Sequence, residues 1–588
     1  MALGLKRLEL VKMVAWLMLA AMAALPLLSW AGPGELDRSF GSENTGFVDY
    51  PLFESFTNNV PVAIALDANR RIVIAGTCEY FFAIVCVGRQ LANGARDTTF
   101  GTQGRAYGFY DIGGFSLAQT QTLATYADGR VVVGGYCGGV SCFFRFRENG
   151  QIDSGFRIST PSTRPYGPFV RAMMVDGTKL VVLSRCGSAS ESGTGCVYRY
   201  LDDGSLDGAP FDLVPTGLQI NPSDAIARDG IGRYLVAGRC AVTGEVPLDV
   251  CIVRLRPDGS FDSSFGLTGV VRITPALPLV SNLPLSLAVD QRGRTLISST
   301  CRKGVPDASA QDVFCLWRVN ADGSIDLSFN SAGAVAASAN QQARNRSVAV
   351  TVTSEGQIAV AGTCVDVVPS GIDSGVVEVN ASAQYCFIAL SDNGQFSSRF
   401  FGGAGQSAFQ LTGSNNRHLS GGAIGMIDDG VGGLVVGGIG YPGVGYFTSS
   451  LQAVTMRLFA AQSRFDVDDD NLIDAATDGI LVLRYLLGIR GTALVAGAVG
   501  IGAARITGDQ VTAYFGAVDR AHPNCPLDIV GSPTGASATL DGMVLLRAML
   551  GITGDAVTAG INFPPGTARA TWTAIRNHLV DNCGMRLP

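Results

Sequence analysis

The sequence predicts a mainly β protein: a seven-bladed β-propeller with disulfide-stapled blades, followed by a small α-helical domain. A hairpin framed by two cysteines recurs six times, about 50 to 65 residues apart, and a seventh copy lacks the cysteines. An opening phrase built around Asp-x-Ser-Phe accompanies each hairpin. At Ser463 the strand-like runs give way to clustered aspartates and a helical pattern. A repeat of this period is typical of arrays of identical supersecondary units.

The first 31 residues, 1–31, have the pattern of a secretory signal peptide. Lys6, Arg7 and Lys12 form a basic start to this segment. The apolar run from Val14 to Leu28 is shorter than the roughly 20 residues that a spanning helix needs. Cleavage is therefore favoured over an uncleaved membrane anchor. We expect an exported protein that is periplasmic, extracellular or attached to the cell surface, with no membrane span after cleavage.

Residues 32–462 contain the repeats, and each opening phrase is followed by four short apolar runs. In the fifth copy these runs contain GVVRIT, PLSLAV, RTLISSTC and CLWRV. Their length and their content of Val, Ile and Leu are typical of strands. Asp-Gly and Asn-Gly pairs after the second and fourth runs suit tight reversals. Each repeat is therefore predicted to be an antiparallel meander of four strands, and seven repeats predict seven blades.

The two ends of the array predict a closed ring. The chain begins with an opening phrase at Leu36 that has no hairpin before it, and the last hairpin, near Leu458, has no phrase after it. A first segment that pairs with the last hairpin would remove an open sheet edge, which otherwise favours aggregation. A closed ring is therefore expected rather than an open solenoid.

Fourteen cysteines fall into seven local pairs. In an exported chain without CxxC motifs, this pattern favours disulfides over zinc sites. Within a repeat, each bridge would join the end of the third strand to the start of the fourth. The loops between paired cysteines vary in length and would lie on one rim, where a binding surface would be expected. The predicted disulfides are Cys78–Cys86, Cys137–Cys142, Cys186–Cys196, Cys240–Cys251, Cys301–Cys315, Cys364–Cys386 and Cys525–Cys583.

The repeat resembles a known bacterial family. The phrase Leu-Asp-x-Ser-Phe-Gly, a Gly-x-x-Val-Val-Ala-Gly strand and an Arg-Leu-x-x-Asp-Gly hairpin are similar to the delta-60 repeats of exported bacterial proteins. The resemblance extends from residue 34 to about 460 and implies a propeller. It implies no activity, because the family is defined by its repeat. The copies at residues 95–97 and 395–401 depart from the phrase, and the cysteine pairs are an addition.

Residues 463–588 begin with an acidic loop whose spacing resembles that of an EF-hand. Carboxylates occupy positions one, three, five and nine of the loop, and a backbone carbonyl occupies position seven. Asn471 stands at position six, where glycine is usual, and Thr477 replaces the carboxylate expected at position twelve. The predicted calcium ligands are Asp466, Asp468, Asp470, the carbonyl of Leu472, Asp474 and Asp478.

An apolar helix follows this loop from Ile480 to Leu487. A loop followed by one such helix is similar to the type I dockerin module, and the resemblance implies duplicated calcium loops. A second copy aligns through Asp541 and Arg547, but its loop retains only Asp528 of the acidic set. We therefore expect one calcium site and a degenerate second copy, locked by its disulfide instead of a metal.

No residue pair in the sequence stands out as a catalytic acid and base. The aspartates of the opening phrases follow the repeat, so they are expected to cap a turn in each copy. The net charge of −6, without a basic cluster, argues against nucleic acid as a partner. The repeated aspartates are Asp37, Asp97, Asp153, Asp207, Asp262 and Asp326.

Together these features favour an exported, non-catalytic binding or scaffold protein at or beyond the cell envelope. Its C-terminal module would dock in a calcium-dependent way, and its partner would be a protein or polysaccharide at the cell surface. One alternative is an extracellular carbohydrate-active enzyme with the propeller as its catalytic domain. Another is a purely structural surface protein.

Overall fold

The computed structural model describes residues 34–585 with gaps. The predicted signal peptide lies outside the described residues. The residues that are not described are 1–33, 39, 42–44, 53–57, 80–82, 109–117, 138–139, 159–169, 187–194, 214–217, 243–248, 275–279, 282–285, 304–310, 341–343, 354–355, 366–381, 399, 402–403, 413–417, 431, 442–450, 460–463, 470–472, 501–502, 504, 522–524, 582, 584 and 586–588.

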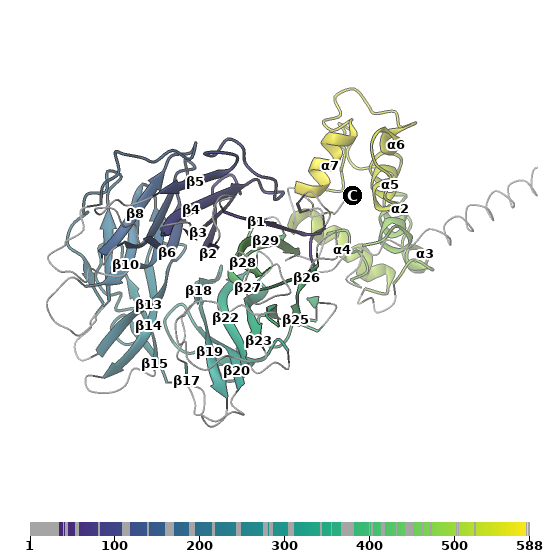
Figure 1. The fold of residues 1–588 in the computed structure, drawn as a ribbon. Helices are drawn as coiled ribbons and strands as arrows, with labels where there is room; N and C mark the ends of the chain where they lie inside the picture. The colour runs from purple at the N-terminus through teal and green to yellow at the C-terminus, as the bar shows by residue number, and fades with distance from the viewer. Residues whose placement is uncertain are drawn as a thin grey trace, which may run out of the picture. The chain divides into compact units, whose positions relative to one another are not determined.

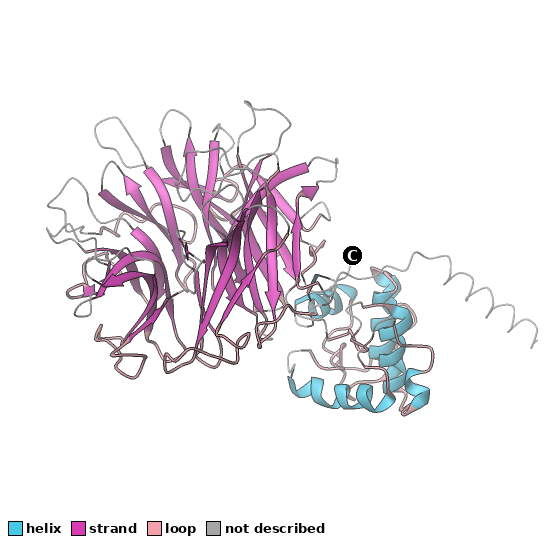
Figure 2. Cartoon of the chain, turned by 90° about the horizontal axis from the view of Figure 1, so that it is seen from below, coloured by secondary structure: helices cyan, strands magenta, loops and turns pink. Residues whose placement is uncertain are grey.

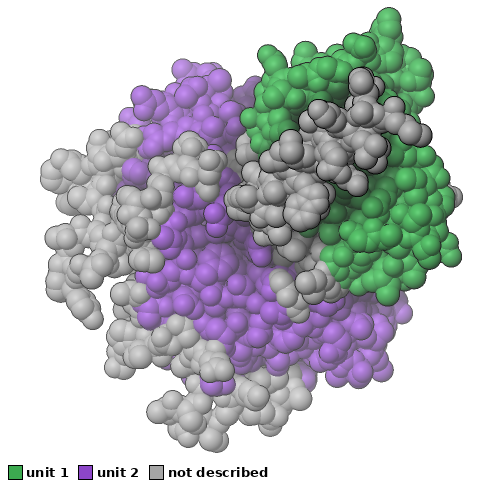
Figure 3. Space-filling model, turned by 90° about the vertical axis from the view of Figure 1, so that its right-hand side faces the viewer, with its two compact units in different colours: residues 1–31, 462–588 green, residues 32–461 purple. Residues whose placement is uncertain are grey.

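The chain divides into two compact units, which Figure 3 colours separately. One unit is Gly32–Ala461, and the other is Gln462–Pro588 together with the first 31 residues. The described part of the first unit is built from strands, and that of the second from helices (Figure 2). None of the described helices is both long enough and apolar enough to cross a membrane.

The strands of the first unit form antiparallel sheets (Figure 1). A single parallel bridge between β20 (Gln311–Val319) and β22 (Arg344–Val352), Asp312 opposite Arg344, joins the fifth and sixth groups of strands into one sheet of nine strands. In chain order the first group is β2 (Asn58–Leu66), β3 (Ile72–Glu79), β4 (Ala83–Gln90) and β5 (Arg105–Gly108), and the second is β6 (Ala118–Thr125), β7 (Val131–Cys137) and β8 (Val140–Phe146). The third group is β9 (Val170–Asp176), β10 (Lys179–Arg185), β11 (Gly195–Tyr200) and β12 (Phe211–Asp212). The fourth is β13 (Leu218–Arg228), β14 (Tyr234–Val242), β15 (Asp249–Leu255) and β16 (Val270–Ile273).

The remaining strands complete the nine-stranded sheet and the last sheet. The two parts of the nine-stranded sheet are β17 (Val280–Ser281), β18 (Ser286–Val289), β19 (Thr295–Lys303), β20 (Gln311–Val319) and β21 (Ala334–Ala337), and then β22 (Arg344–Val352), β23 (Ile358–Val365), β24 (Gln384–Leu390) and β25 (Gln406–Phe409). The last sheet contains β26 (Leu411–Thr412), β27 (His418–Asp428), β28 (Gly433–Tyr441), β29 (Gln452–Phe459) and β1 (Phe47–Tyr50).

The sheets do not coincide with the sequence repeats. Among the described strands, the short run after an opening phrase pairs with the hairpin before it, as β5 pairs with β4 and β16 with β15. The expectation that each repeat forms its own meander is therefore wrong by one strand. Residues 91–104 connect β4 to β5, and within them Asp97 donates its N–H to the carbonyl of Arg89 in β4. Because the phrase is held on the preceding strand, the run after it completes the preceding sheet.

One strand of each group contacts a strand of the next group, and these contacts form a closed circle. Strand β2 contacts β6, and the series continues through β9, β13, β18, β22 and β27 back to β2. Strand β1 pairs with β29, with Phe47 opposite Met456, and Leu36 forms a bridge to Leu458. The predicted pairing of the N-terminal segment with the last hairpin is confirmed. Antiparallel sheets arranged in a closed ring define a β-propeller.

All seven predicted disulfides are present, and they use every cysteine of the chain. Within the propeller each bond joins neighbouring strands of a hairpin, as Cys78 in β3 joins Cys86 in β4. Most residues of the loops between bonded cysteines lie outside the described part, and the predicted binding rim lies there with them. The bonds are Cys78–Cys86, Cys137–Cys142, Cys186–Cys196, Cys240–Cys251, Cys301–Cys315, Cys364–Cys386 and Cys525–Cys583.

The helical unit has two halves with the same order of elements around one core that includes Leu481, Val544 and Ile575. We call residues 464–521 the first half and residues 525–585 the second half. The first half contains the π-helical turn η2 (Ala475–Gly479), α2 (Ile480–Leu486), α3 (Thr492–Val495) and α4 (Gly508–Ala521). The second half contains η3 (Ala538–Gly542), α5 (Met543–Met549), α6 (Asp555–Thr558) and α7 (Trp572–Asp581).

Candidate metal centre

Three aspartates converge in the first half of the helical unit. One carboxylate oxygen from each of Asp466, Asp468 and Asp478 lies within 4.8 Å of the others. All three residues are at most 1% exposed. Carboxylates held this close and away from water repel one another, and a bound cation or proton relieves that repulsion.

Asp478 is the member of this cluster with the best-defined surroundings. It belongs to η2, and its carboxylate accepts hydrogen bonds from the N–H groups of Val467 and Asp474, the latter at 3.0 Å. The Thr477 hydroxyl donates to the same carboxylate at 3.2 Å. Burial, and next the Asp468 carboxylate, raise the pKa of Asp478 well above its ordinary value. The carboxylate that follows the expected position twelve by one residue is therefore part of the cluster.

The other predicted ligands are placed differently. Asp474 caps η2, because its Oδ1 accepts the N–H groups of Ala476 at 2.8 Å and Thr477 at 2.7 Å. Asp470 and Leu472 lie outside the described residues, as does Asn471 between them. Just before this gap, Asp469 has a positive φ of 64°, the left-handed conformation that tight loops require.

Sequence reasoning did not single out Arg505, which contacts the acidic loop from a distant part of the chain. Its Nε donates to the carbonyl of Val467 at 2.6 Å, and its Nη2 donates to the carbonyl of Asp466 at 2.7 Å. Its Nη1 lies 3.2 Å from the Asp469 carboxylate. The sequence signal that could have indicated Arg505 is its repetition, because Arg569 is the equivalent residue of the second half and holds that loop in the same way.

The second half repeats this frame without the acidic cluster. Arg569 donates through Nε to the carbonyl of Ile529 at 2.6 Å and through Nη2 to that of Asp528 at 3.0 Å. Asp541 takes the place of Asp478, and its carboxylate accepts the N–H groups of Val530 at 2.9 Å and Ser537 at 2.7 Å. Burial outweighs these hydrogen bonds and raises the pKa of Asp541.

The chemistry of the donor set in the first half suits a hard divalent cation. Calcium binds six to eight oxygen ligands, mostly carboxylates and carbonyls. Asp466, Asp468 and Asp478 offer carboxylates within one small volume. The described residues of the second half form no comparable group of carboxylates. The residues present therefore fit a cation in the first half only.

The repeated aspartates of the propeller are engaged in structural contacts. Asp97 accepts the N–H of Thr99 at 3.1 Å, which confirms the predicted turn cap. Its other oxygen accepts Arg89 Nε at 2.7 Å, and the same guanidinium lies over the Phe100 ring. The sequence signal for this partner is an arginine eight residues before the aspartate. The pattern recurs at Arg145–Asp153, Arg254–Asp262 and Arg318–Asp326.

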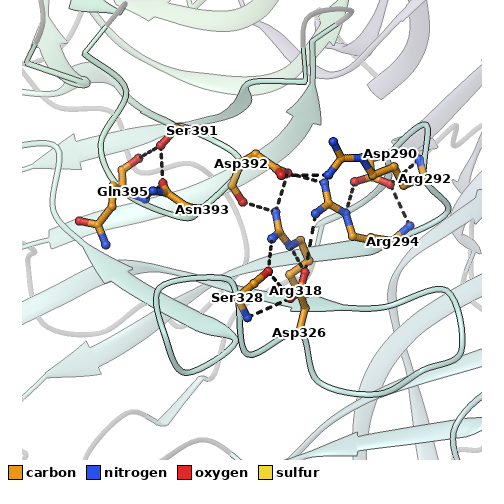
Figure 4. A network of polar contacts seen from close by, with 10 residues as sticks. All are labelled: Asp290, Arg292, Arg294, Arg318, Asp326, Ser328, Ser391, Asp392, Asn393 and Gln395. Carbon is orange, nitrogen blue, oxygen red and sulfur yellow. Dashed lines mark hydrogen bonds and ion pairs between the residues drawn. The ribbon is translucent and has the colours of Figure 1, made fainter.

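These arginines also link one group of strands to the next group along the chain. Figure 4 shows Arg318 between Asp326, at 2.8 Å from its Nε, and Asp392 in the turn after β24. Arg318 Nη1 donates to the Asp392 carbonyl at 2.6 Å, and Arg294 pairs with the Asp392 carboxylate. At the junction of the ring, Arg457 in β29 pairs with Asp37 at 3.1 Å. Aspartates tied into such contacts are explained by the architecture.

Hydrogen bonding favours the ionised form of several of these aspartates. Burial opposes ionisation of Asp262, but the Ser264 hydroxyl, the Ser264 N–H and Arg254 outweigh it and lower the pKa of Asp262 to about 2. The same kinds of contact lower the pKa of Asp326. A depressed pKa is the opposite of what a general acid near neutral pH needs.

Comparison with known proteins supports the propeller. A family described as "Domain of unknown function (DUF5122) beta-propeller" matches residues 127–156, 232–265 and 307–329. No curated protein matches the chain. The three matched segments each contain an opening phrase or the strands beside it.

Several solved structures are similar at low identity. A protein of unknown function from Dyadobacter fermentans is 10% identical, with a TM-score of 0.36 over 71% of this chain and 99% of that chain. The polysaccharide lyase Uly1 is 10% identical, with a TM-score of 0.41 over 74% and 98%. A gluconolactonase from Xanthomonas campestris is 14% identical, with a TM-score of 0.30 over 61% and 92%. Likenesses at this level do not bear on function.

Proposed function

We propose that this chain is an exported, non-catalytic binding or scaffold protein that docks through a calcium-loaded C-terminal module. The observation that carries the proposal is the convergence of three buried carboxylates, Asp466 and Asp468 from a loop with EF-hand-like spacing and Asp478 from the turn η2 that follows it. When bound, calcium would neutralise these carboxylates and fix the loop against α2. Asp470 and the carbonyl of Leu472 would complete the ligand set, and Asp474 would hold the start of η2.

The proposal includes the finer family relationships. The repeated frame of loop, turn and helix in the two halves supports a dockerin-like module with one calcium site and a degenerate second copy. The opening phrases with their arginine partners support a delta-60-like repeat. The closed circle of strand contacts from β2 to β27 and back supports seven blades. The partner of the module would be a protein or a polysaccharide at the cell surface.

The redox chemistry of the chain supports export. Seven disulfides form and persist in an oxidising compartment, outside the reducing cytosol. The first 31 residues would then be the signal peptide that directs export. The bonds would maintain the hairpins beyond the cell envelope, where the proposed docking takes place.

Calcium binding is tested by calorimetric titration of the full chain with calcium. We expect one saturable site, and binding at least tenfold weaker in Asp468→Asn and Asp478→Asn. Asp541→Asn is the matched control, because it alters the equivalent carboxylate of the second half, and it should bind like the unaltered chain. A chelator should lower the unfolding temperature of the helical signal at 222 nm. Absence of a saturable site, or an equal loss in Asp541→Asn, would contradict the proposal.

The non-catalytic role is tested with a panel of extracellular polysaccharides. The ion pairs that hold the periodic aspartates support a structural use of these residues. We expect binding at most, without release of reducing ends or unsaturated products. Turnover that disappears on replacing a carboxylate of the propeller would contradict this part of the proposal and favour a carbohydrate-active enzyme.

A further inference from the structure

One arginine holds the acidic loop from the side of the backbone. The guanidinium of Arg505 donates hydrogen bonds to the carbonyls of Asp466 and Val467, and the peptide N–H of Arg505 donates to the carbonyl of Asp468 at 2.8 Å. Its Nη1 pairs with Asp469. Four consecutive residues of the loop are therefore fixed by contacts to a single residue.

These contacts decide which oxygens the loop can offer. The carbonyls of residues 466–468 already accept hydrogen bonds, while Val467 is buried in the apolar core. The carboxylates of Asp466 and Asp468 meet that of Asp478 instead. The N–H of Gly500, in the same connection between α3 and α4 as Arg505, donates to Asp468 Oδ2 at 2.6 Å. Backbone and side chain of the loop are thus both held by this connection.

We propose that Arg505 is a positioning residue for the cation site. It holds the backbone of residues 466–469 so that Asp466 and Asp468 stand beside Asp478 before a cation arrives. Without it, three carboxylates that repel one another would separate, and calcium binding would have to order the loop again. The inference rests on the proposed calcium function, and it assigns to Arg505 a role that no ligand spacing indicates.

The charge and the hydrogen bonds of Arg505 act on cation affinity in opposite directions. A guanidinium close to the site repels a cation, so removal of the charge alone would strengthen calcium binding. Removal of the backbone contacts would weaken it. Arg505→Met removes the charge and the side-chain hydrogen bonds to the two carbonyls. Arg505→Lys keeps the charge but loses the planar fork that reaches both carbonyls. If positioning dominates, both variants bind calcium more weakly.

Arg569 is a matched control within the same chain. It makes the corresponding contacts to the carbonyls of Asp528 and Ile529, but beside a loop without the acidic cluster. Arg569→Met therefore removes a comparable set of backbone hydrogen bonds and should destabilise the helical unit to a similar extent. Because its loop is not the calcium site, calcium binding should be unchanged.

The experiment is calorimetric calcium titration of the full chain, unaltered and as Arg505→Met, Arg505→Lys and Arg569→Met. Circular dichroism at 222 nm checks that each variant keeps its helices. We expect about tenfold weaker calcium binding in both Arg505 variants, which is typical of residues that orient metal ligands. We expect Arg569→Met to bind calcium as tightly as the unaltered chain. If Arg505→Met loses its helical signal, the calcium affinity of Arg505→Lys provides the test.

Two results are decisive against the inference in different ways. A folded Arg505 variant that binds calcium as tightly as the unaltered chain, or more tightly, would overturn the positioning role and leave the calcium function standing. Absence of binding by the unaltered chain would overturn the calcium function, and the positioning role with it.

Discussion

The two halves of the helical unit share a frame and differ in what the frame holds. Both have a π-helical turn, a helix whose arginine caps the next short helix, and an arginine fixed to the loop backbone. In the first half the frame surrounds three buried carboxylates. In the second, Asp541 is satisfied by backbone N–H groups, and Cys525–Cys583 crosslinks the chain. The same loop frame therefore occurs once with a buried cluster of carboxylates and once without it.

The largest expected effect comes from the disulfide of the second half. Replacing Cys525 and Cys583 by alanine opens a bond between residues 58 apart in sequence. The chain-entropy estimate for a loop of this size is about 4 kcal/mol of unfolding free energy. Denaturant unfolding followed at 222 nm measures the loss. If the halves are locked independently, calcium affinity of the folded double variant stays unchanged, and a large loss of affinity would show that they are not.

The next effect is a pH dependence that belongs to the second half. Burial, and then Arg569 and Arg464, lower the pKa of His578 from 6.5 to about 4. The unfolded chain takes up this proton first, so stability present at neutral pH is lost as the pH falls from about 6.5 to 4, by up to about 3 kcal/mol. Unfolding free energies across this range measure it.

His578→Gln provides the control for this pH dependence. Its unfolding free energy should change less over the same range, because the group that titrates is gone. The difference between the two profiles gives the contribution of His578 to the pH dependence of the unfolding free energy. It removes the contribution of Asp478, whose raised pKa makes stability increase as the pH falls. Tyr514 occupies the equivalent position of α4, and its hydroxyl donates to the Arg464 carbonyl at 2.6 Å. Identical profiles for the variant and the unaltered chain would contradict the assignment.

A smaller effect should be equal in the two halves. Arg484 Nη1 donates to the carbonyls of Leu494 and Ala496 at 3.0 and 2.8 Å. Arg547 makes the same two contacts in the second half at 2.9 and 2.8 Å. Methionine at either position should cost about 2 kcal/mol of unfolding free energy. Thermal unfolding measures the two losses. A marked difference between the variants would mean that these arginines contribute unequally to stability in the two halves.

The smallest effect concerns the left-handed position of the second loop. Gly531 has a positive φ of 66°, where the first half has Asp469 with 64°. Alanine at Gly531 would place its Cβ 2.9 Å from the Cβ of Ala568. We expect the unfolding free energy to fall by about 1 kcal/mol, because residues with a side chain disfavour this conformation. Denaturant unfolding measures the change. No loss would indicate that the second loop relaxes freely, unlike the first.

Local sequence patterns predicted the hairpins and their disulfides because both depend on neighbouring residues. Cys78 and Cys86 lie eight residues apart on one hairpin, and register brings them together. The strand that completes each sheet was misassigned, since run length and composition do not say which neighbour a strand pairs with. The Arg89–Asp97 contact followed a constant spacing and could have been found from the repeats.

The candidate metal centre was predicted in part. The spacing of Asp466 and Asp468 indicated ligands on one loop. That Asp478 joins them, while Asp474 caps η2, depends on how the turn is wound after the loop. Arg505 was missed because it reaches the loop across more than thirty residues of sequence, as the separation of 38 residues from Val467 shows.

The sequence by itself determined the repeat, the cysteine pairs, the export pattern and the acidic loop, because each depends on residues close together in the chain. Only the tertiary structure decided which strand completes each sheet, how β1 pairs with β29, and which carboxylates share one buried volume. These arrangements are set by packing and hydrogen bonds between segments far apart in sequence. Local pattern carries no information about such contacts until the chain has folded.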